Sequence, residues 1–161
     1  MRRKDREAGA RDEVEGILAG CKTCHVAMLD GDMPYVVPLS FGYRFVGDGA
    51  LELFFHSAHE GKKIEALKRN GRVCFEVSCE GVPVRAESPC DSGYYYSSVI
   101  GYGEAVFIED AAGKCEGLAI MFRHQTGRDV VFSNEQAESV CVFKIVSSDY
   151  TGKRKLKGPP G

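Results

Sequence analysis

The sequence has no apolar run that approaches the roughly 20 residues a membrane-spanning helix needs. Its first residues, MRRKDREAGARDE, are charged and lack the apolar segment of a signal peptide. The formal charge of −2 gives no basic excess of the kind that nucleic-acid-binding surfaces need. We therefore expect a cytoplasmic protein that binds neither membrane nor nucleic acid.

Hydrophobic residues make up 43% of the 161 residues, which is ordinary for a globular protein and excludes a disordered one. This length fits one domain with a substantial core. We expect a single domain over residues 1–161, with its core at residues 11–153. Residues 154–161 are basic and rich in Gly and Pro, so we expect a mobile tail there.

The cysteine count is odd, and in a reducing compartment this favours free thiols over a disulfide framework. The seven are Cys21, Cys24, Cys74, Cys79, Cys90, Cys115 and Cys141. Cys21, Cys24 and His25 match C-x-x-C-H, the c-type haem attachment pattern, but such attachment normally belongs to exported proteins. A zinc site needs about four ligands, more than cluster here. We interpret the match as accidental and predict no metal site.

The hydrophobic pattern predicts a mainly β protein with a few helices. Strands are expected at residues 24–29, 34–45, 50–56, 72–78, 97–108 and 138–146. Helices are expected at residues 12–20, between Ser57 and Asn70, and at residues 110–125. The strands occur in runs and not in strict alternation with helices. This order favours an antiparallel β-barrel with attached helices.

Two segments interrupt this pattern. Pro38 lies inside the second strand, where it cannot donate a ladder hydrogen bond. It implies either a bulge whose free backbone groups bind a ligand or a plain edge strand. Residues 80–93 contain Pro83 and Pro89 and read as a loop long enough to be functional.

The segment LELFFHSAHEGKKIEALKRN, residues 51–70, reads as a strand that passes into a helix. Ser57 and Glu60 fit an S-x-x-E capping box, which satisfies free N–H groups at a helix start. Gly61 permits close approach of a ligand, and Lys62 and Lys63 add positive charge to a helix N-terminus that already attracts anions. We interpret this segment as a phosphate cradle, with an ordinary capped helix and solvated lysines as the alternative. It is not a Walker A loop, because Ile64 follows Lys63.

Four segments occur in an order that resembles the pyridoxamine 5′-phosphate oxidase-like flavoproteins, and within them the nitroimidazole-resistance (Nim-type) branch. They are PYVVPLSFGY, FFHSAHEGKKIEAL, NGRVCFEV and YYYSSVIGYGEAVFIED. The resemblance covers roughly residues 11–153. It implies an FMN-binding split β-barrel that forms a homodimer, with FMN at the dimer interface.

The resemblance also implies roles for individual residues. The strand that runs beside the flavin ring corresponds to Pro38, Leu39, Ser40 and Phe41. The phosphate-binding residues correspond to Ser57, Lys62 and Lys63, in agreement with the cradle and its Gly61. A Y-x-S-V segment corresponds to Tyr96–Val99, whose Ser98 and Val99 would reach the flavin of the partner subunit. The Nim-type branch has a histidine at the position of His56, beside the flavin.

The chain departs from the oxidase itself. No basic residue is obvious near Val36 at the start of the flavin-contacting strand, and the C-terminal substrate-binding arginine and histidine motif is missing. Our leading hypothesis is therefore an FMN-dependent reductase of a small electron-poor compound such as a nitroimidazole. His56 would supply a proton or orient the substrate, with a nicotinamide as possible electron donor.

Two alternatives remain open. One is a haem-binding or haem-handling protein on the same barrel, and its candidate iron ligands are His25, His56, His59 and His124. The other is a flavin-binding sensor without turnover.

Overall fold

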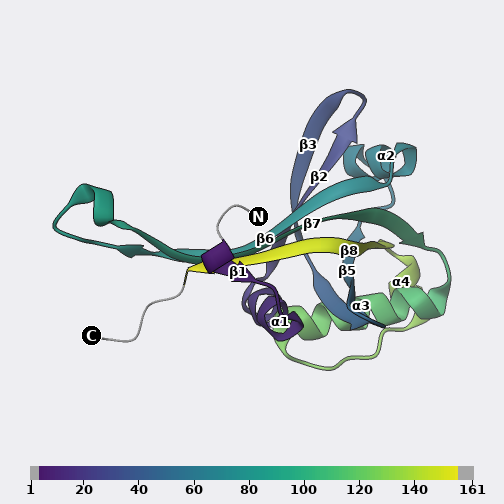
Figure 1. Cartoon of the computed structure of the whole chain (residues 1–161). Helices are drawn as coiled ribbons and strands as arrows, with labels where there is room; N and C mark the ends of the chain where they lie inside the picture. The colour runs from purple at the N-terminus through teal and green to yellow at the C-terminus, as the bar shows by residue number, and fades with distance from the viewer. Residues whose placement is uncertain (1–3, 156–161) are drawn as a thin grey trace.

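One antiparallel sheet organises the computed structural model, which describes residues 4–155 apart from the side chains of Lys4 and Glu80 (Figure 1). The strands are β1 (Glu7–Ala8), β2 (Thr23–Asp30), β3 (Met33–Ser40), β4 (Gly42–Val46), β5 (Ala50–Ser57), β6 (Arg72–Val84), β7 (Gly93–Ile108) and β8 (Cys141–Lys155). The helices are α1 (Arg11–Gly20), α2 (Lys62–Arg69), α3 (Ala111–Thr126) and α4 (Asn134–Glu138), with 3-10 turns at Lys4–Arg6 and Pro89–Asp91. None of the helices within residues 4–155 is long and apolar enough to cross a membrane.

The sheet curls so that its two edge strands come together at one corner. Its strand order is β3-β2-β6-β7-β8-β5-β4, with β1 paired to β8. The edge strands β3 and β4 are consecutive in the chain, and only Phe41 separates them. A sheet whose first and last strands are joined by one residue must close on itself, and the result is a split barrel. The predicted mainly β fold is confirmed.

The barrel interior is filled by one face of each strand. In β5, Leu51, Leu53 and Phe55 point inward, because strand side chains alternate between faces. Phe55 stacks on Phe143 of β8, with ring centroids 5.1 Å apart. Large aromatic side chains packed in this way contribute a large share of the apolar area buried on folding.

Helix α3 packs directly against β4. A Cβ atom on Gly42 would lie 2.6 Å from the Cα of Met121, so only glycine permits this close approach. The helix begins at an N-cap, Asp110, whose carboxylate accepts a hydrogen bond from the Gly113 N–H at 2.7 Å. It ends at Gly127, which has a φ of 74°. The helix that walls the site described below is thus fixed by its caps and by backbone contact.

The predicted second strand, residues 34–45, is in fact two strands. The break falls at Phe41 and not at Pro38, which stays in register opposite His25. Strand β3 is an edge strand of the sheet, and an edge has one unpaired side that tolerates proline. The plain edge-strand alternative is therefore the correct one for Pro38.

The predicted loop at residues 80–93 is largely a hairpin arm. Strand β6 continues to Val84 and β7 starts at Gly93, with Val82 opposite Tyr95 and Pro83 opposite Tyr94. Figure 1 shows this hairpin projecting from one end of the barrel. Strand β8 supports the base of the arm, because it runs to Lys155, opposite Tyr96, and not to residue 146 as predicted. Of the predicted mobile tail, residues 154 and 155 lie in this strand and residues 156–161 lie outside the described part.

The prediction that all cysteines are free thiols is wrong. Cys21, just after α1, and Cys79 of β6 form a disulfide with their Cα atoms 5.4 Å apart. They are 58 residues apart in sequence and meet because α1 packs against β6. An odd count requires only that one cysteine stays unpaired, so it never excluded this bond. The remaining cysteine of the C-x-x-C-H pattern, Cys24, is fully buried in the core.

We predict that Gly42→Ala lowers the free energy of unfolding by about 1–3 kcal/mol, because the added methyl group overlaps the backbone of α3. The measurement is urea-induced unfolding. Gly16→Ala is the matched control, since Gly16 lies within α1 with nothing within 4 Å of its Cβ position. The control should leave stability unchanged or raise it by about 0.5–1 kcal/mol. Equal midpoints for both variants would contradict the proposed contact.

Candidate functional site

A cavity of about 510 Å³ lies between α3, α4 and the ends of strands β3 and β5. Its lining residues are Ser40, His56, Leu118, Met121, Phe122, Gln125, Phe132, Gln136, Ser139 and Val140. Most of the lining is apolar and a few polar groups converge on it, as in small-molecule sites of this size. The cavity brings together two residues predicted from sequence, Ser40 and His56.

His56 reaches the cavity because of its place in β5. Its neighbours Phe55 and Ser57 point into the barrel, so alternation turns His56 to the opposite face, toward α3. Its side chain is exposed, and within residues 4–155 it makes no hydrogen bond or ion pair. The imidazole is thus available to a ligand in the cavity.

Ser57, the last residue of β5, is buried, and its Oγ has no hydrogen-bond partner within the described residues. Its strand partner is Cys141 of β8. Because this pairing holds Ser57 in the sheet, the hydroxyl does not cap α2. The predicted capping box with Glu60 is wrong: the N-cap is Gly61, with a φ of 122° and no side-chain cap. A buried hydroxyl without a partner is costly, and a ligand oxygen would satisfy it.

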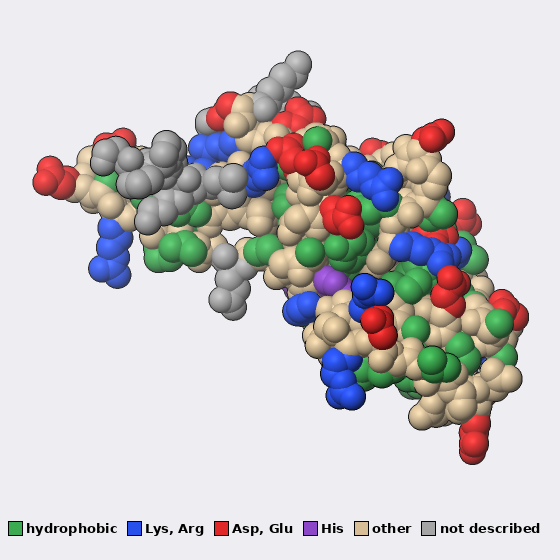
Figure 2. Space-filling model, turned by 90° about the horizontal axis from the view of Figure 1, so that it is seen from below, with side chains coloured by type: hydrophobic (Ala, Val, Ile, Leu, Met, Phe, Trp, Pro, Cys, Tyr) green, Lys and Arg blue, Asp and Glu red, His purple; other side chains and the backbone are tan. Residues whose placement is uncertain are grey.

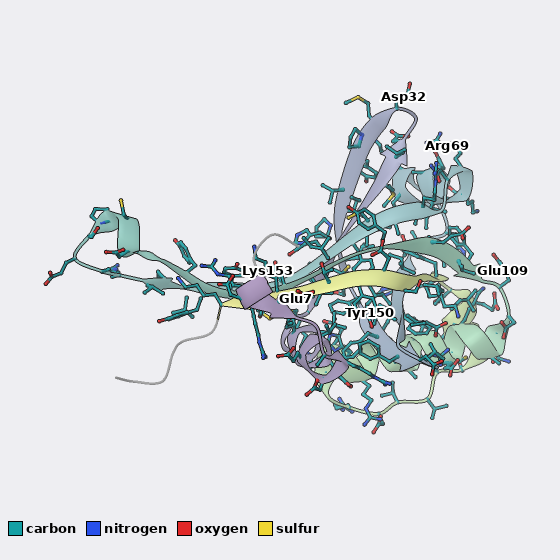
Figure 3. All side chains as sticks on the ribbon, viewed as in Figure 1. Glu7, Asp32, Arg69, Glu109, Tyr150 and Lys153 are labelled. Atoms are coloured by element: carbon teal, nitrogen blue, oxygen red, sulfur yellow. A yellow bond between two sulfur atoms is a disulfide. The ribbon has the colours of Figure 1, made fainter. Side chains whose placement is uncertain are left out.

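The two predicted lysines have different surroundings. The Lys62 ammonium lies 3.0 Å from the Asp30 carboxylate and 4.6 Å from the centre of the Tyr35 ring. The hydrogen bond from Lys62 lowers the pKa of Asp30, assisted by Arg69, which Figure 3 shows beside the β2–β3 hairpin. Lys63 is half-buried and makes no ion pair within residues 4–155. Lys63 is therefore the member of the pair with charge to offer a ligand.

Further positive charge surrounds the strand partner of Ser57. Burial raises the pKa of the Cys141 thiol and Glu109 adds to this rise, while Lys68, Lys114 and Lys63 lower it. Lys114 of α3 is buried and donates to Glu138 at 3.0 Å. Sequence reasoning missed Lys114, because it is separated from the cradle by 50 residues and no motif marks it. The structure thus adds a basic field to the end of the barrel at which Ser57 lies.

The predicted flavin-contacting strand is divided between faces. Pro38 is exposed on the outer face of the sheet, and Leu39 packs partly buried against the core. Ser40 lines the cavity, whereas Phe41 is fully buried. The Phe41 carbonyl accepts a hydrogen bond from Gln125 at 2.8 Å. Only Ser40 of these four offers a side chain to the cavity.

The predicted pair on β7, Ser98 and Val99, does not lie at this cavity. Ser98 sits opposite Ser78 and Lys153, and Val99 is buried inside the barrel. Neither residue lines the cavity. Any contact between them and a ligand in this cavity would have to come from a second copy of the chain.

Three of the four histidines have hydrogen-bond partners. The ring of His25 lies 3.1 Å from Glu76, that of His59 lies 3.0 Å from the Glu138 carbonyl, and that of His124 lies 2.8 Å from the Cys21 carbonyl. Within residues 4–155, no group of three or more His, Cys, Asp or Glu side chains is placed to hold a metal ion.

Comparison with known proteins identifies the class. A candidate 5-nitroimidazole antibiotic resistance protein from Bacteroides thetaiotaomicron is 33% identical, over 92% of this chain and 86% of its own, with a TM-score of 0.79. The FAD and haem binding protein from Mycobacterium smegmatis is 19% identical over 97% of this chain and 76% of its own, at a TM-score of 0.79. Flavocytochrome Anf3 from Azotobacter vinelandii is 23% identical, over 100% of this chain and 74% of its own, with a TM-score of 0.78. No curated protein matches the chain.

The fold and these similarities define a split β-barrel. The profile of the pyridoxamine 5′-phosphate oxidase family matches residues 10–154. The chain belongs to this family, and it is similar to a member linked to nitroimidazole resistance. The resemblance read from the sequence is thus confirmed at the level of family and fold.

Proposed function

We propose that this protein binds FMN and uses it to reduce a small electron-poor compound such as a nitroimidazole. The observation that carries the proposal is the buried, unpartnered Ser57 Oγ close to the basic end of the barrel. Ser57 and Lys63, with the uncapped N-terminus of α2 at Gly61, would hold the phosphate. The cavity lined by Ser40 and His56 would receive the substrate beside the flavin.

Bound FMN supplies the two-electron redox chemistry. The chain's own residues would position the reactants and control protons. Leu118, Met121 and Phe122 line the α3 side of the cavity and limit water there. His56 has no competing partner within residues 4–155, and an imidazole can deliver a proton near neutral pH.

We favour FMN over FAD because the cradle suits a terminal phosphate monoester. Its donors, the Ser57 hydroxyl, the Lys63 ammonium and backbone N–H groups, suit an oxygen-rich dianion. Cytoplasmic location remains part of this proposal. Haem binding is the second candidate, supported only by fold similarity to haem-binding proteins, and His56 would then be the open ligand in the cavity.

We predict that Ser57→Ala separates ligand binding from stability. In the FMN-free protein the free energy of unfolding should stay unchanged or rise, since the variant removes a buried hydroxyl without a partner. FMN affinity should fall by roughly 10- to 100-fold, the value of a hydrogen bond to a charged group. The measurement is fluorescence titration of FMN, paired with urea unfolding.

Lys63→Ala should weaken FMN binding by a similar factor. Lys62→Ala is the matched control and should lose less FMN affinity, because the Lys62 ammonium already forms an ion pair with Asp30. Unchanged affinity in both Ser57→Ala and Lys63→Ala would mean that the phosphate binds elsewhere.

The reductase activity is tested in the FMN-loaded protein under anaerobic conditions. We expect the flavin absorption to be lost on addition of NADH or NADPH and to return when a nitroimidazole is added. His56→Gln should keep its FMN but reoxidise about 100-fold more slowly with the nitro compound, the usual loss for an acid–base group. Reoxidation no faster than in buffer alone would favour a sensor, and a Soret band in the purified protein would favour haem.

We also propose that the protein is a homodimer that pairs through the outer face of the sheet. The register places Val36, Cys74 and Tyr102 in one row across β3, β2, β6 and β7. Val36 is 57% exposed, Ile100 45% and Tyr102 60%. Contiguous exposed apolar residues of this kind mark interaction sites, and a symmetric copy of the same face would cover them.

In sedimentation velocity the protein should therefore run as a dimer, and Tyr102→Glu should yield monomers because it buries a charge in the interface. Val131→Glu provides the matched control, since Val131 is 97% exposed and lies in the loop before α4, away from this face. A dimer that persists in Tyr102→Glu would assign the interface to another surface.

A further inference from the structure

A second cavity, of about 470 Å³, lies between α1, β4 and α3. We call it the basic cleft. It shares α3 with the cavity that holds His56 but uses other residues of the helix. Met121, Phe122 and Gln125 line the His56 cavity, whereas Arg123 and His124 line the basic cleft. No residue lines both cavities.

The basic cleft carries an excess of positive charge. Arg11, Lys22, Arg44 and Arg123 line it, against a single carboxylate, Glu15. Two of these cations are already paired: Arg44 lies 2.6 Å from Glu52 and from Glu116, and Arg123 lies 3.2 Å from Asp129. Figure 2 views the molecule from the side of α1 and α3 and shows basic side chains around the histidine visible there.

Arg11 and Lys22 make no ion pair within residues 4–155. The Arg11 guanidinium lies over the Phe45 ring, 4.7 Å from its centre, and Lys22 donates a hydrogen bond to the His124 carbonyl. Neither side chain is paired with a carboxylate within the described residues. Arginine and lysine side chains both bind phosphate groups through charge-assisted hydrogen bonds.

Aromatic rings form the floor of the cleft. Tyr43 meets Phe45 edge-on with centroids 6.2 Å apart and meets His124 at 5.2 Å. Burial raises the pKa of Tyr43, whose hydroxyl donates to the Glu15 carbonyl at 3.5 Å. The His124 Nε2 must carry a proton, because its partner, the Cys21 carbonyl, only accepts. That leaves Nδ1 of the neutral ring as an acceptor.

We propose that the basic cleft binds a nucleotide, with the aromatic base against Tyr43 and the phosphates on Lys22 and on the Arg11 guanidinium that lies over the Phe45 ring. Rings stack favourably with aromatic side chains, and cations at the rim select a phosphorylated ring over a neutral one. Because the two cavities share no lining residue and lie on different sides of α3, this nucleotide is not positioned to react in the His56 cavity. The cleft is a second, separate ligand site.

The test is isothermal titration of ADP into the full chain, both as purified and saturated with FMN. The FMN-saturated sample keeps the flavin cavity filled, and the FMN-free sample makes the result independent of the proposed reductase function. We expect saturable binding of one ADP per chain in both samples, weakened by added salt. Adenosine and inorganic pyrophosphate, which each lack one half of the ligand, should bind at least about tenfold more weakly.

Arg11→Gln and Lys22→Gln should each weaken ADP binding about tenfold, the loss expected for one charge-assisted contact. Arg128→Gln removes the same charge from an exposed residue outside the cleft and should bind like the unchanged protein. Phe45→Leu, a variant that keeps both cations, should also lose affinity. Thermal unfolding of each variant checks that it is folded.

Several outcomes would overturn the proposal. The first is the absence of saturable ADP binding. The second is equal loss in Arg128→Gln, which would indicate a general charge effect. If pyrophosphate bound as tightly as ADP, the base would contribute nothing to binding, and the proposed aromatic contact would be wrong. An acidic peptide such as hexaglutamate that displaced ADP at equal concentration would assign the cleft to a protein partner.

Discussion

The close contact between α3 and the junction of the two edge strands fixes both cavities. Phe41 alone joins β3 to β4, and its carbonyl accepts a hydrogen bond from Gln125 at 2.8 Å. The same amide donates to the Lys22 carbonyl at 2.9 Å, so one side chain ties together the edge of the barrel and the start of β2. Gly42 lets the helix backbone approach without a side chain between. With its position set in this way, α3 forms a rigid wall between the cavity of His56 and the basic cleft.

Helix α3, held in this position, presents two chemically distinct sides to the two cavities. On a helix, residues three or four apart share a face, so Leu118, Met121 and Gln125 face one cavity while Ile120 and His124 face the other. The first side is mostly apolar, and the second is basic. A single helix thereby separates two chemically different cavities.

Local pattern predicted the barrel, and it failed wherever contacts between distant segments decide the structure. Alternation in β5 turns His56 outward and Ser57 inward, and both follow from neighbouring residues. The capping box failed because pairing with Cys141, 84 positions later, keeps Ser57 in the sheet. The Cys21–Cys79 bond depends on how α1 packs against β6, which no local signal encodes. The hairpin arm was missed because cross-strand pairing overrides the loop preference of its prolines.

The Ser57 Oγ is the buried side-chain atom without a hydrogen-bond partner in the described part of the chain. A buried hydroxyl without a partner costs about 1–3 kcal/mol, and alanine would avoid that cost at no loss of packing. Its strand partner Cys141 cannot relieve it, because a thiol is a weak donor and a weak acceptor. The neighbouring lysines have donors only, so they could satisfy the hydroxyl oxygen but not its proton. A group that both accepts this proton and draws Lys63 toward it is an anion with several oxygens, and a phosphate monoester meets both conditions.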